Sequence, residues 1–308
     1  MNSCIGTATR RKKSKSAKGE LIFYSLLLIL PLTQILVFYF GVNFQSILMV
    51  FQDYDTYNNE YIWDISVNIQ KFLIDIKQQA FWIMVKNSFV VWLFTGLICT
   101  TLAVIFAYYI YKRRTGHNFF KFALFLPSVL PAILLVVTFK KFVGSALPAF
   151  DKFLFDKSVD SVFAYSSTAR FWIVTVFSVA ISFGGQVLVY TGAMDQISPE
   201  IIEAGEIDGA GTLREFVSIV LPSVFPTIGT FLITGVAGIF TNQNNLFNFF
   251  GQTAAPNEKT VGYYLYTMVY ETGGKGGYCY AAFLGFVCTL VVLPIAFGVR
   301  KMVEKVQE

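Results

Sequence analysis

Histidine, cysteine and charged side chains are all scarce in this chain. Its 308 residues include one histidine, four cysteines and only 14% charged residues. The cysteines, at positions 4, 99, 279 and 288, show no CxxC or other metal-ligand spacing, and His117 stands alone in a polar segment. These absences exclude a histidine-based metal site and a histidine-dependent catalytic triad. Without a clustered acid, base or metal set, a membrane enzyme is a poor interpretation of the sequence.

The sequence also lacks the phosphate-binding loop GxxxxGK[ST], so the chain is not itself an ATPase of that type. What it has instead is apolar surface, because 55% of the residues are hydrophobic and 33 of them are phenylalanine. A soluble domain of this length would need far more charge to cover its surface. The apolar runs are continuous rather than alternating, which favours membrane-spanning helices over a closed barrel.

Six transmembrane helices are therefore predicted in an all-α integral membrane protein. Each run reaches or exceeds the ~20 residues that a helix needs to cross a bilayer. The predicted spans are 21–41, 81–111, 119–139, 171–194, 217–240 and 278–299. We predict three regions along the chain: a basic tail at 1–19, the first span with its outer loop at 20–80, and a membrane core at 81–308.

Basic residues predict the orientation of these spans. The segments 1–19 and 112–121 carry six and four Lys or Arg, whereas the longer segments 43–80, 142–169 and 241–277 each carry two between the spans. Basic residues mark cytoplasmic segments, so both termini are predicted to lie in the cytoplasm. The basic run at 10–18 is better explained as this topology signal than as a nucleic-acid site. No cleavage site follows the first span, which we interpret as a retained helix.

Ionisable side chains are missing from the middle of spans two to six. Proton-driven and voltage-driven proteins usually need such groups at that depth. Their absence argues against a self-powered secondary transporter, although sodium-coupled transport through carbonyl and hydroxyl ligands stays open. An autonomous transporter or channel is kept as the alternative function.

An acidic segment separates the fourth and fifth spans. Ser198 can cap a helix, Pro199 suits its first position, and Gly209 or Gly211 can end it in a left-handed conformation. A helix of two to three turns over 199–208 is therefore predicted on the cytoplasmic side. Its acidic residues are Glu200, Glu203, Glu206 and Asp208. A solvated surface helix would look the same, so the residues alone do not assign it a role.

The order of residues in this segment resembles the Glu-Ala-Ala loop of ABC importer permeases, specifically the carbohydrate branch. "EAGEIDGA" followed by "IVLP" matches the pattern at Glu203, Ala204, Gly205, Gly209, Ile219, Leu221 and Pro222. Gly205 departs from the pattern, because the family has a second alanine there. Weaker similarities at 85–89, 126–133 and 260–287 extend the resemblance over about 86–299, so that 81–308 would be the permease core.

The resemblance implies a subunit of an importer for a sugar or oligosaccharide in the bacterial cell membrane. Its partners would be a second permease in a heterodimer, two cytoplasmic ATPase subunits that bind ATP and Mg, and an extracytoplasmic solute-binding protein. This chain would hold no cofactor and contact membrane lipid but no nucleic acid. The short helix would couple to an ATPase and move spans four and five. The implied coupling residues are Glu200, Ile201, Glu203, Ala204, Gly205, Ile207, Asp208 and Gly209.

Polar side chains within or beside the spans are candidates for the transport path. Ser182, Gln186 and Tyr190 follow one another at i, i+4 steps in span four, and Asn242 and Asn245 share a face at the end of span five. Amides beside aromatic rings suit a sugar. Packing between helices, or a plain outer loop for the asparagines, explains them equally well. Four tyrosines are expected to form an interfacial belt: Tyr263, Tyr264, Tyr278 and Tyr280.

Overall fold

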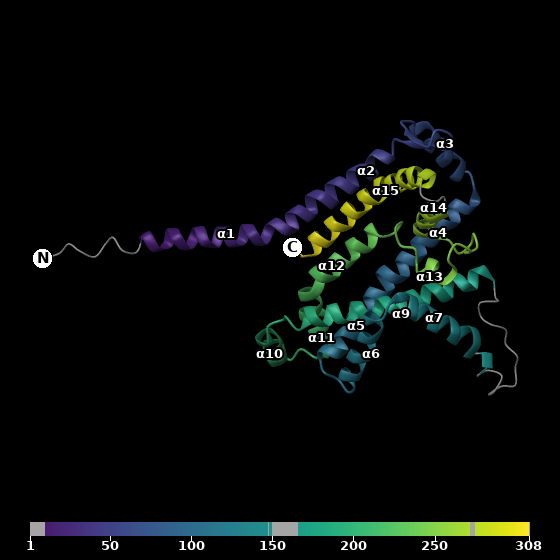
Figure 1. The fold of residues 1–308 in the computed structure, drawn as a ribbon. Helices are drawn as coiled ribbons and strands as arrows, with labels where there is room; N and C mark the ends of the chain where they lie inside the picture. Colours follow the sequence, from purple (N-terminus) through teal and green to yellow (C-terminus); the bar gives the residue numbers. More distant parts are fainter. Residues whose placement is uncertain (1–9, 147, 150–165, 272–274, 308) are drawn as a thin grey trace.

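The computed structural model describes residues 10–146, 148–149, 166–271 and 275–307, and it is helical over most of them (Figure 1). Most of the predicted outer loop at 142–169 and the first nine residues of the basic tail lie outside the described residues. Five helices are long and apolar enough to cross a membrane, and one bent pair brings the number of candidate spans to six. The prediction of an all-α membrane protein with six candidate spans is confirmed at this level.

The spans are assembled from consecutive helical segments, several of which contain a π-helical stretch. The first comprises α1 (Arg10–Gln34), η1 (Ile35–Val42) and α2 (Asn43–Met49). The second comprises α4 (Gln79–Trp92), η2 (Leu93–Ile98) and α5 (Cys99–Tyr111). The remaining long helices are α9 (Ser167–Met194), α11 (Thr212–Glu215) continued by η5 (Phe216–Val220) and α12 (Leu221–Ala237), and α15 (Lys275–Gln307).

The predicted third span is broken rather than continuous. It consists of α6 (His117–Val129) and α7 (Ala132–Lys141), the latter extended by η3 (Phe142–Ala146). The axis of the second half is bent by 106° from that of the first. Leu130 is extended, with φ −82° and ψ 142°, directly before Pro131. Because a proline disfavours helical geometry in the residue before it, the helix ends there and restarts beyond it. The expectation of one straight helix over 119–139 was therefore wrong.

Several short elements that were not predicted from the sequence, including a β-hairpin, lie at one end of the bundle. An antiparallel hairpin joins β1 (Asp53–Asp55) to β2 (Glu60–Ile62) within the predicted loop 43–80. The helices α3 (Ile65–Asp75), α13 (Leu246–Phe250) and α14 (Val261–Glu271) lie at this same end, on the right in Figure 1. The start of α1, the end of α15 and α10 (Pro199–Ile207) lie toward the left.

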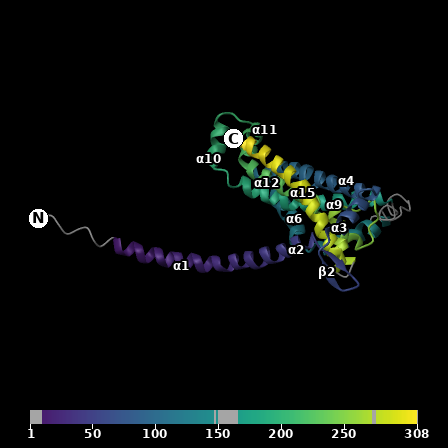
Figure 2. The same ribbon diagram turned by 90° about the horizontal axis from the view of Figure 1, so that it is seen from above.

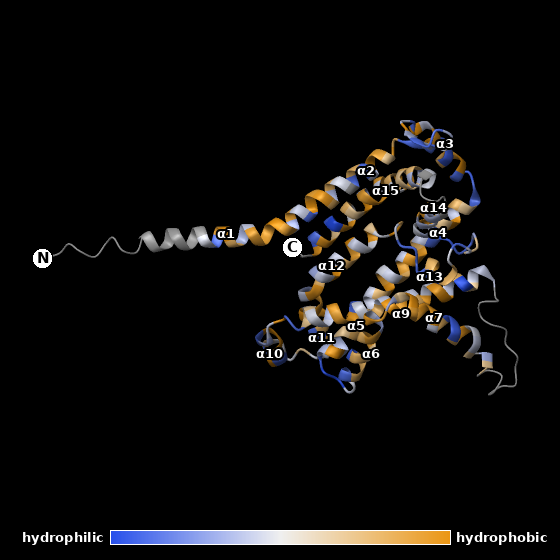
Figure 3. Ribbon diagram, in the orientation of Figure 1, coloured by the Kyte–Doolittle hydropathy of each residue, from blue (hydrophilic) through white to orange (hydrophobic). Residues whose placement is uncertain are grey.

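The core forms where α5 packs on α9 and α12 packs on α15, with α6 also against α9. Small residues permit this packing, as Gly184 shows: a Cβ there would lie 2.5 Å from the carbonyl oxygen of Leu124 on α6. Such close approach of backbones is the usual way in which helices associate in a bilayer. The long helices are hydrophobic over most of their length (Figure 3), and many of their large apolar side chains are exposed, as lipid contact requires.

The first span stands apart from this core. Its α1 part extends away from the other helices in both views (Figures 1 and 2), whereas α2 packs against α15. The most apolar window of the span is 0% buried within the chain, and apolar side chains from Leu21 to Phe40 are exposed along it. Lipid or another protein must therefore cover this exposed part of the helix.

Candidate functional site

The acidic segment between the fourth and fifth spans folds as a separate short helix, α10. It begins at Pro199, and Ser198 occupies the cap position, although its side chain makes no capping hydrogen bond. The helix ends at Asp208, whose N–H donates to the carbonyl oxygen of Ala204. Gly209 follows with φ +77°, the left-handed geometry that glycine adopts without strain. The predicted helix is thus observed, while Gly211 is extended and instead precedes α11.

One side chain anchors α10 and most of the others are exposed. Ile202 is buried in the core cluster with Tyr190 and Val220. Ile201 and Ile207 are 52% and 85% exposed, large values for isoleucine. Exposed around them are the predicted coupling residues Glu200, Glu203, Ala204, Asp208 and Gly209. The result is an acidic surface with two protruding apolar side chains, which suits contact with another protein.

Gly205, the departure from the Glu-Ala-Ala pattern, faces the start of the fifth span. A Cβ at this position would lie 2.5 Å from the Cδ1 atom of Ile219. That atom is the far end of a flexible side chain, so a small rotation of Ile219 would relieve the clash. The glycine therefore permits a closer approach of α10 to η5 than alanine would.

Lys112 joins α10 and α11 to the second span. Its Nζ lies 2.9 Å from Oε2 of Glu215 and 3.4 Å from Oε1 of Glu206. The Glu215 side chain is only 3% exposed and that of Glu206 is 58% exposed, so the Glu215 contact is the sheltered one. Partial burial lowers the pKa of Lys112, but hydrogen bonds and charge from Glu215 and Glu206 outweigh it and raise the pKa overall.

A second contact lies beside this ion pair. The Tyr108 hydroxyl on α5 donates to the carbonyl oxygen of Thr212, at 3.0 Å. The end of α5 is therefore fastened to α11 by two contacts. Sequence reasoning missed Lys112 and Glu215, because they are about a hundred positions apart and Lys112 served only as a topology signal.

A cavity of about 300 Å³ opens among η2, α5, α9 and α12. Three predicted transport residues line it: Ser182, Gln186 and Asn242. Its walls also include Trp92, Phe231 and Ile239, and the glycines Gly96, Gly235 and Gly238. Thr234, Thr241 and Asn242 are exposed, so the cavity opens onto the surface of the chain.

The other two predicted transport residues lie elsewhere. Tyr190 is fully buried in the core cluster and packs against the ring of Phe231, with 5.3 Å between centroids. Asn245 adopts a left-handed conformation, with φ 55°, and its amide donates to the Ser178 hydroxyl at 3.0 Å. Neither residue lines the cavity. Both therefore hold the fold together in this structure, and the prediction is narrowed to Ser182, Gln186 and Asn242.

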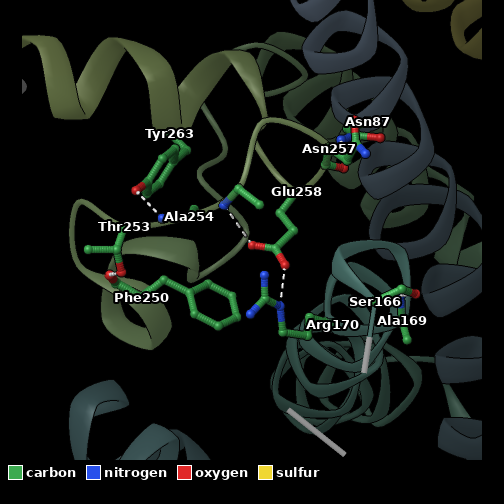
Figure 4. Close-up of polar contacts among 11 residues, drawn as sticks. Asn87, Ser166, Ala169, Arg170, Phe250, Thr253, Ala254, Asn257, Glu258 and Tyr263 are labelled. Carbon is green, nitrogen blue, oxygen red and sulfur yellow. Dashed lines mark hydrogen bonds and ion pairs between the residues drawn. The ribbon is translucent and has the colours of Figure 1, made fainter. Parts of the chain in front are cut away.

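A network of polar contacts fixes the segment before α14 (Figure 4). Arg170, at the start of α9, forms an ion pair with the fully buried Glu258, whose other oxygen accepts from the N–H of Ala255 at 2.9 Å. The Asn87 amide on α4 donates to the carbonyl oxygens of Asn257 and Lys259 at 2.9 and 3.0 Å. The segment 254–259 is thus held to two spans.

The expected tyrosine belt is wrong for three of its four members. Tyr263 is fully buried, and its hydroxyl donates to the carbonyl oxygen of Gly251 at 2.8 Å. The hydroxyls of Tyr264 and Tyr280 both donate to Asp75, at 3.0 and 2.6 Å. These rings satisfy internal polar groups instead of facing the membrane surface. Within the described residues, no group of three His, Cys, Asp or Glu could hold a metal ion.

Comparison with solved structures identifies the class of fold. The chain superposes on the transmembrane part of a bacterial alginate ABC transporter, solved with a periplasmic protein that binds an alginate pentasaccharide, with TM-score 0.75. The match covers 96% of this chain and 98% of that chain at 18% identity. A second structure of such a transporter, which imports the acidic polysaccharide alginate, matches with TM-score 0.74. The chain therefore shares the fold of a chain of these ABC transporters.

Sequence comparison gives more particular relatives. The chain is 25% identical over 287 residues to the multiple sugar-binding transport system permease MsmF of Streptococcus mutans, covering 90% of this chain and 94% of that protein. It is 23% identical over 224 residues to the lactose transport permease LacF of Rhizobium radiobacter, covering 71% and 74% respectively. No model of a protein family matches the chain. In sequence and in fold the chain is similar to permeases of carbohydrate-uptake ABC transporters.

Proposed function

We propose that this chain is the permease subunit of an ATP-driven, binding-protein-dependent importer for a sugar or oligosaccharide in the bacterial cell membrane. The single observation that carries the proposal is the exposed acidic helix α10. It lies between the fourth and fifth spans, in a chain of which 90% aligns with a multiple sugar-binding transport permease. The proposed regions are the basic tail 1–19, the first span and outer loop 20–80, and the permease core 81–308.

In this proposal α10 is the coupling helix. Glu203, Ala204 and Gly209 match the Glu-Ala-Ala pattern and Gly205 replaces its second alanine, while the exposed Ile201 and Ile207 would enter a cleft of a cytoplasmic ATPase. ATP-driven closure of the ATPases would displace α10, and the displacement would pass into the spans that it joins. ATP and Mg would bind to the ATPase subunits and not to this chain.

The proposed topology places both termini and α10 in the cytoplasm. The start of α1, the end of α15 and α10 lie toward one side of the structure, opposite the hairpin, α3 and α14, which supports this orientation (Figure 1). The basic residues in 1–19 and 112–121 support it independently.

A second, similar permease is the proposed partner within the membrane. The cavity opens onto the surface of this chain, and the most apolar window of the first span is 0% buried within it. Both features fit a heterodimer in which the partner completes the path. A solute-binding protein would deliver the solute at the end of the bundle that carries α3, α13 and α14.

Reconstitution tests the proposal directly. The chain is incorporated into vesicles with and without its ATPase and partner permease, and solute uptake is measured with and without ATP. Uptake that requires all the subunits and ATP supports the importer. Uptake by the chain alone, indifferent to ATP, would instead establish an autonomous transporter.

A single substitution tests the role of α10. Glu203 is exposed and forms no ion pair with another described residue, so Glu203→Lys changes the charge of the proposed docking surface without disturbing the fold. We expect ATP-dependent uptake to fall at least about tenfold, because a like-charge or mismatched contact at a protein interface costs over ~1.4 kcal/mol. Glu304→Gln, on the exposed end of α15, is the matched control. Normal uptake by Glu203→Lys would reduce α10 to a solvated connector.

A further inference from the structure

The cavity among η2, α5, α9 and α12 carries no charge. None of the residues that line it, among those the structure describes, is Asp, Glu, Lys, Arg or His. Its polar groups are hydroxyls and amides. The relatives do not decide what such a cavity carries, because one transports lactose and a matching structure imports an acidic polysaccharide. The class of solute is therefore inferred from the chemistry of the residues that line the cavity.

Four of the five hydroxyl groups in the lining, all of them on threonines, already donate their protons within the protein. The hydroxyls of Thr95, Thr234 and Thr241 donate to the carbonyl oxygens of Val91, Thr230 and Gly238, at 2.8, 2.7 and 3.3 Å. The Thr100 hydroxyl donates to Oε1 of Gln186 at 3.1 Å. A hydroxyl has one proton and two lone pairs, so each of these oxygens keeps the capacity to accept a hydrogen bond.

The donors that remain in the lining are all neutral. The indole Nε1 of Trp92, which lines the cavity, is buried and has no hydrogen-bond partner among the described residues. The Gln186 amide makes a long contact of 3.4 Å with the carbonyl oxygen of Thr95, and the Ser182 hydroxyl and the Asn242 amide also line the cavity. The lining that the structure describes therefore offers neutral acceptors, neutral donors and an aromatic wall, but no cation.

This pattern suits one class of solute. A phosphate or carboxylate has only acceptors, so it needs several donors or a cation when it leaves water. A neutral glycan brings hydroxyl protons that match the acceptors, and its oxygens can accept from the indole. Its apolar ring faces can pack against Trp92 and Phe231.

We infer that this cavity admits neutral, hydroxyl-rich solutes and rejects anionic ones. The inference rests on the proposed function and narrows it to uncharged sugars or oligosaccharides. Specificity here comes from the side-chain oxygens of Thr95, Thr100, Gln186 and Thr234, which accept hydrogen bonds from the hydroxyl groups of the solute. Trp92 adds its indole N–H and its ring face.

The test uses cells that express the intact importer and matched cells without this chain. Both are incubated with a mixture of lactose, raffinose, arabinotriose, an alginate trisaccharide and sn-glycerol 3-phosphate, and depletion from the medium is followed by mass spectrometry. We expect chain-dependent depletion of at least one neutral compound, exceeding that of either anion by about tenfold or more. Chain-dependent depletion of an anion at a comparable rate would overturn the inference and leave the importer intact. If the chain alters depletion of no compound, the proposed function fails and the inference fails with it.

Two neighbouring threonines provide a matched pair of variants. Thr100 lines the cavity, whereas Thr101 is exposed on another face of α5 and donates to the carbonyl oxygen of Leu97 at 2.9 Å. Thr100→Val is expected to lower uptake of the neutral solute several-fold and Thr101→Val to leave it unchanged. Thr234→Lys should raise the ratio of anion to neutral uptake about tenfold, because it adds the missing cation. Equal behaviour of the two valine variants, or an unchanged ratio in Thr234→Lys, would show that the solute does not pass this lining.

Discussion

Replacing Lys112 with methionine should release the segment formed by α10 and α11 from the second span. Methionine keeps the length of the side chain but removes the charge that faces Glu215 and Glu206. Breaking a sheltered ion pair by removing one partner costs roughly 3 kcal/mol or more, because the other charge stays behind in a poor environment. The Glu206 contact adds less than about 1 kcal/mol, since that carboxylate is 58% exposed. The expected loss is therefore about 3 kcal/mol, and nearly all of it belongs to the Glu215 contact.

Proteolysis at Arg214 measures this loss locally. Arg214 is an exposed residue of α11, next to Glu215, and cleavage there requires the segment to open. A loss of about 3 kcal/mol raises the open population up to about a hundredfold, since ~1.4 kcal/mol is a factor of ten. An arginine-specific protease and mass spectrometry of the purified chain report the rate at this site, in the regime where cleavage follows the open population.

Variants of Lys112, Glu206 and Glu215 test whether the Glu215 contact is the one that holds the segment. Glu206→Gln should raise cleavage only a few-fold, and Lys112→Arg should leave it nearly unchanged. The double variant Lys112→Met, Glu215→Leu should recover most of the protection, because an apolar pair of similar size replaces the ion pair without leaving a buried charge. If Lys112→Met and Glu206→Gln are cleaved at the same rate, the sheltered pair does not hold the segment.

The pH dependence of this contact has a definite sign. The pKa of Lys112 is raised above its ordinary value of 10.5, so its contribution to stability is complete below that value and is lost only as the pH rises through the raised pKa. Protection at Arg214 should therefore not change with Lys112 ionisation across neutral pH.

Two further predictions concern packing and the outer network. Gly205→Ala should change the protection of α10 from proteolysis by less than about 1 kcal/mol, because the gain in helix propensity offsets the displacement of Ile219. Protection in Gly205→Ala combined with Ile219→Val should exceed that of the wild type. A large loss of protection in both variants would contradict the contact between position 205 and Ile219. Arg170→Met should leave the buried Glu258 unpaired and cost roughly 3–5 kcal/mol, seen as faster amide hydrogen exchange across 254–259. The double variant with Glu258→Leu should restore slow exchange, and failure to do so would assign the effect to another contact of Arg170, such as the Phe250 ring.

The spans could be predicted from the sequence because each is a long apolar run, and the bilayer fixes how long such a run must be. The break of the helix at Leu130 was not predicted from the sequence, although Pro131 follows it there. Pro127 sits within α6 without ending it, so a proline in a span does not by itself decide whether the helix stops. The hairpin at β1 and β2 was missed because its strands are three residues each, too short for a reliable alternation.

The candidate site was predicted in part, for a geometric reason. Each i, i+4 step advances about 40° beyond a full turn. Two steps therefore rotate Tyr190 about 80° from Ser182, which carries its ring from the cavity into the core. Lys112 and Glu215 could not be paired from the sequence, because their contact depends on how α5 packs against α11.

The contact of Lys112 with Glu206 and Glu215 also bears on the mechanics of transport. If α10 were attached to only two helices, it could rotate about the line that joins the two attachment points. A third attachment away from that line prevents this rotation. The chain joins α10 to α9 and, through α11, to α12, and Lys112 adds α5 as the third support. These same three helices carry Thr100, Gln186 and Thr234 to the cavity. Torque applied to α10 would therefore reach three walls of the cavity together, so that they turn as one body around the solute.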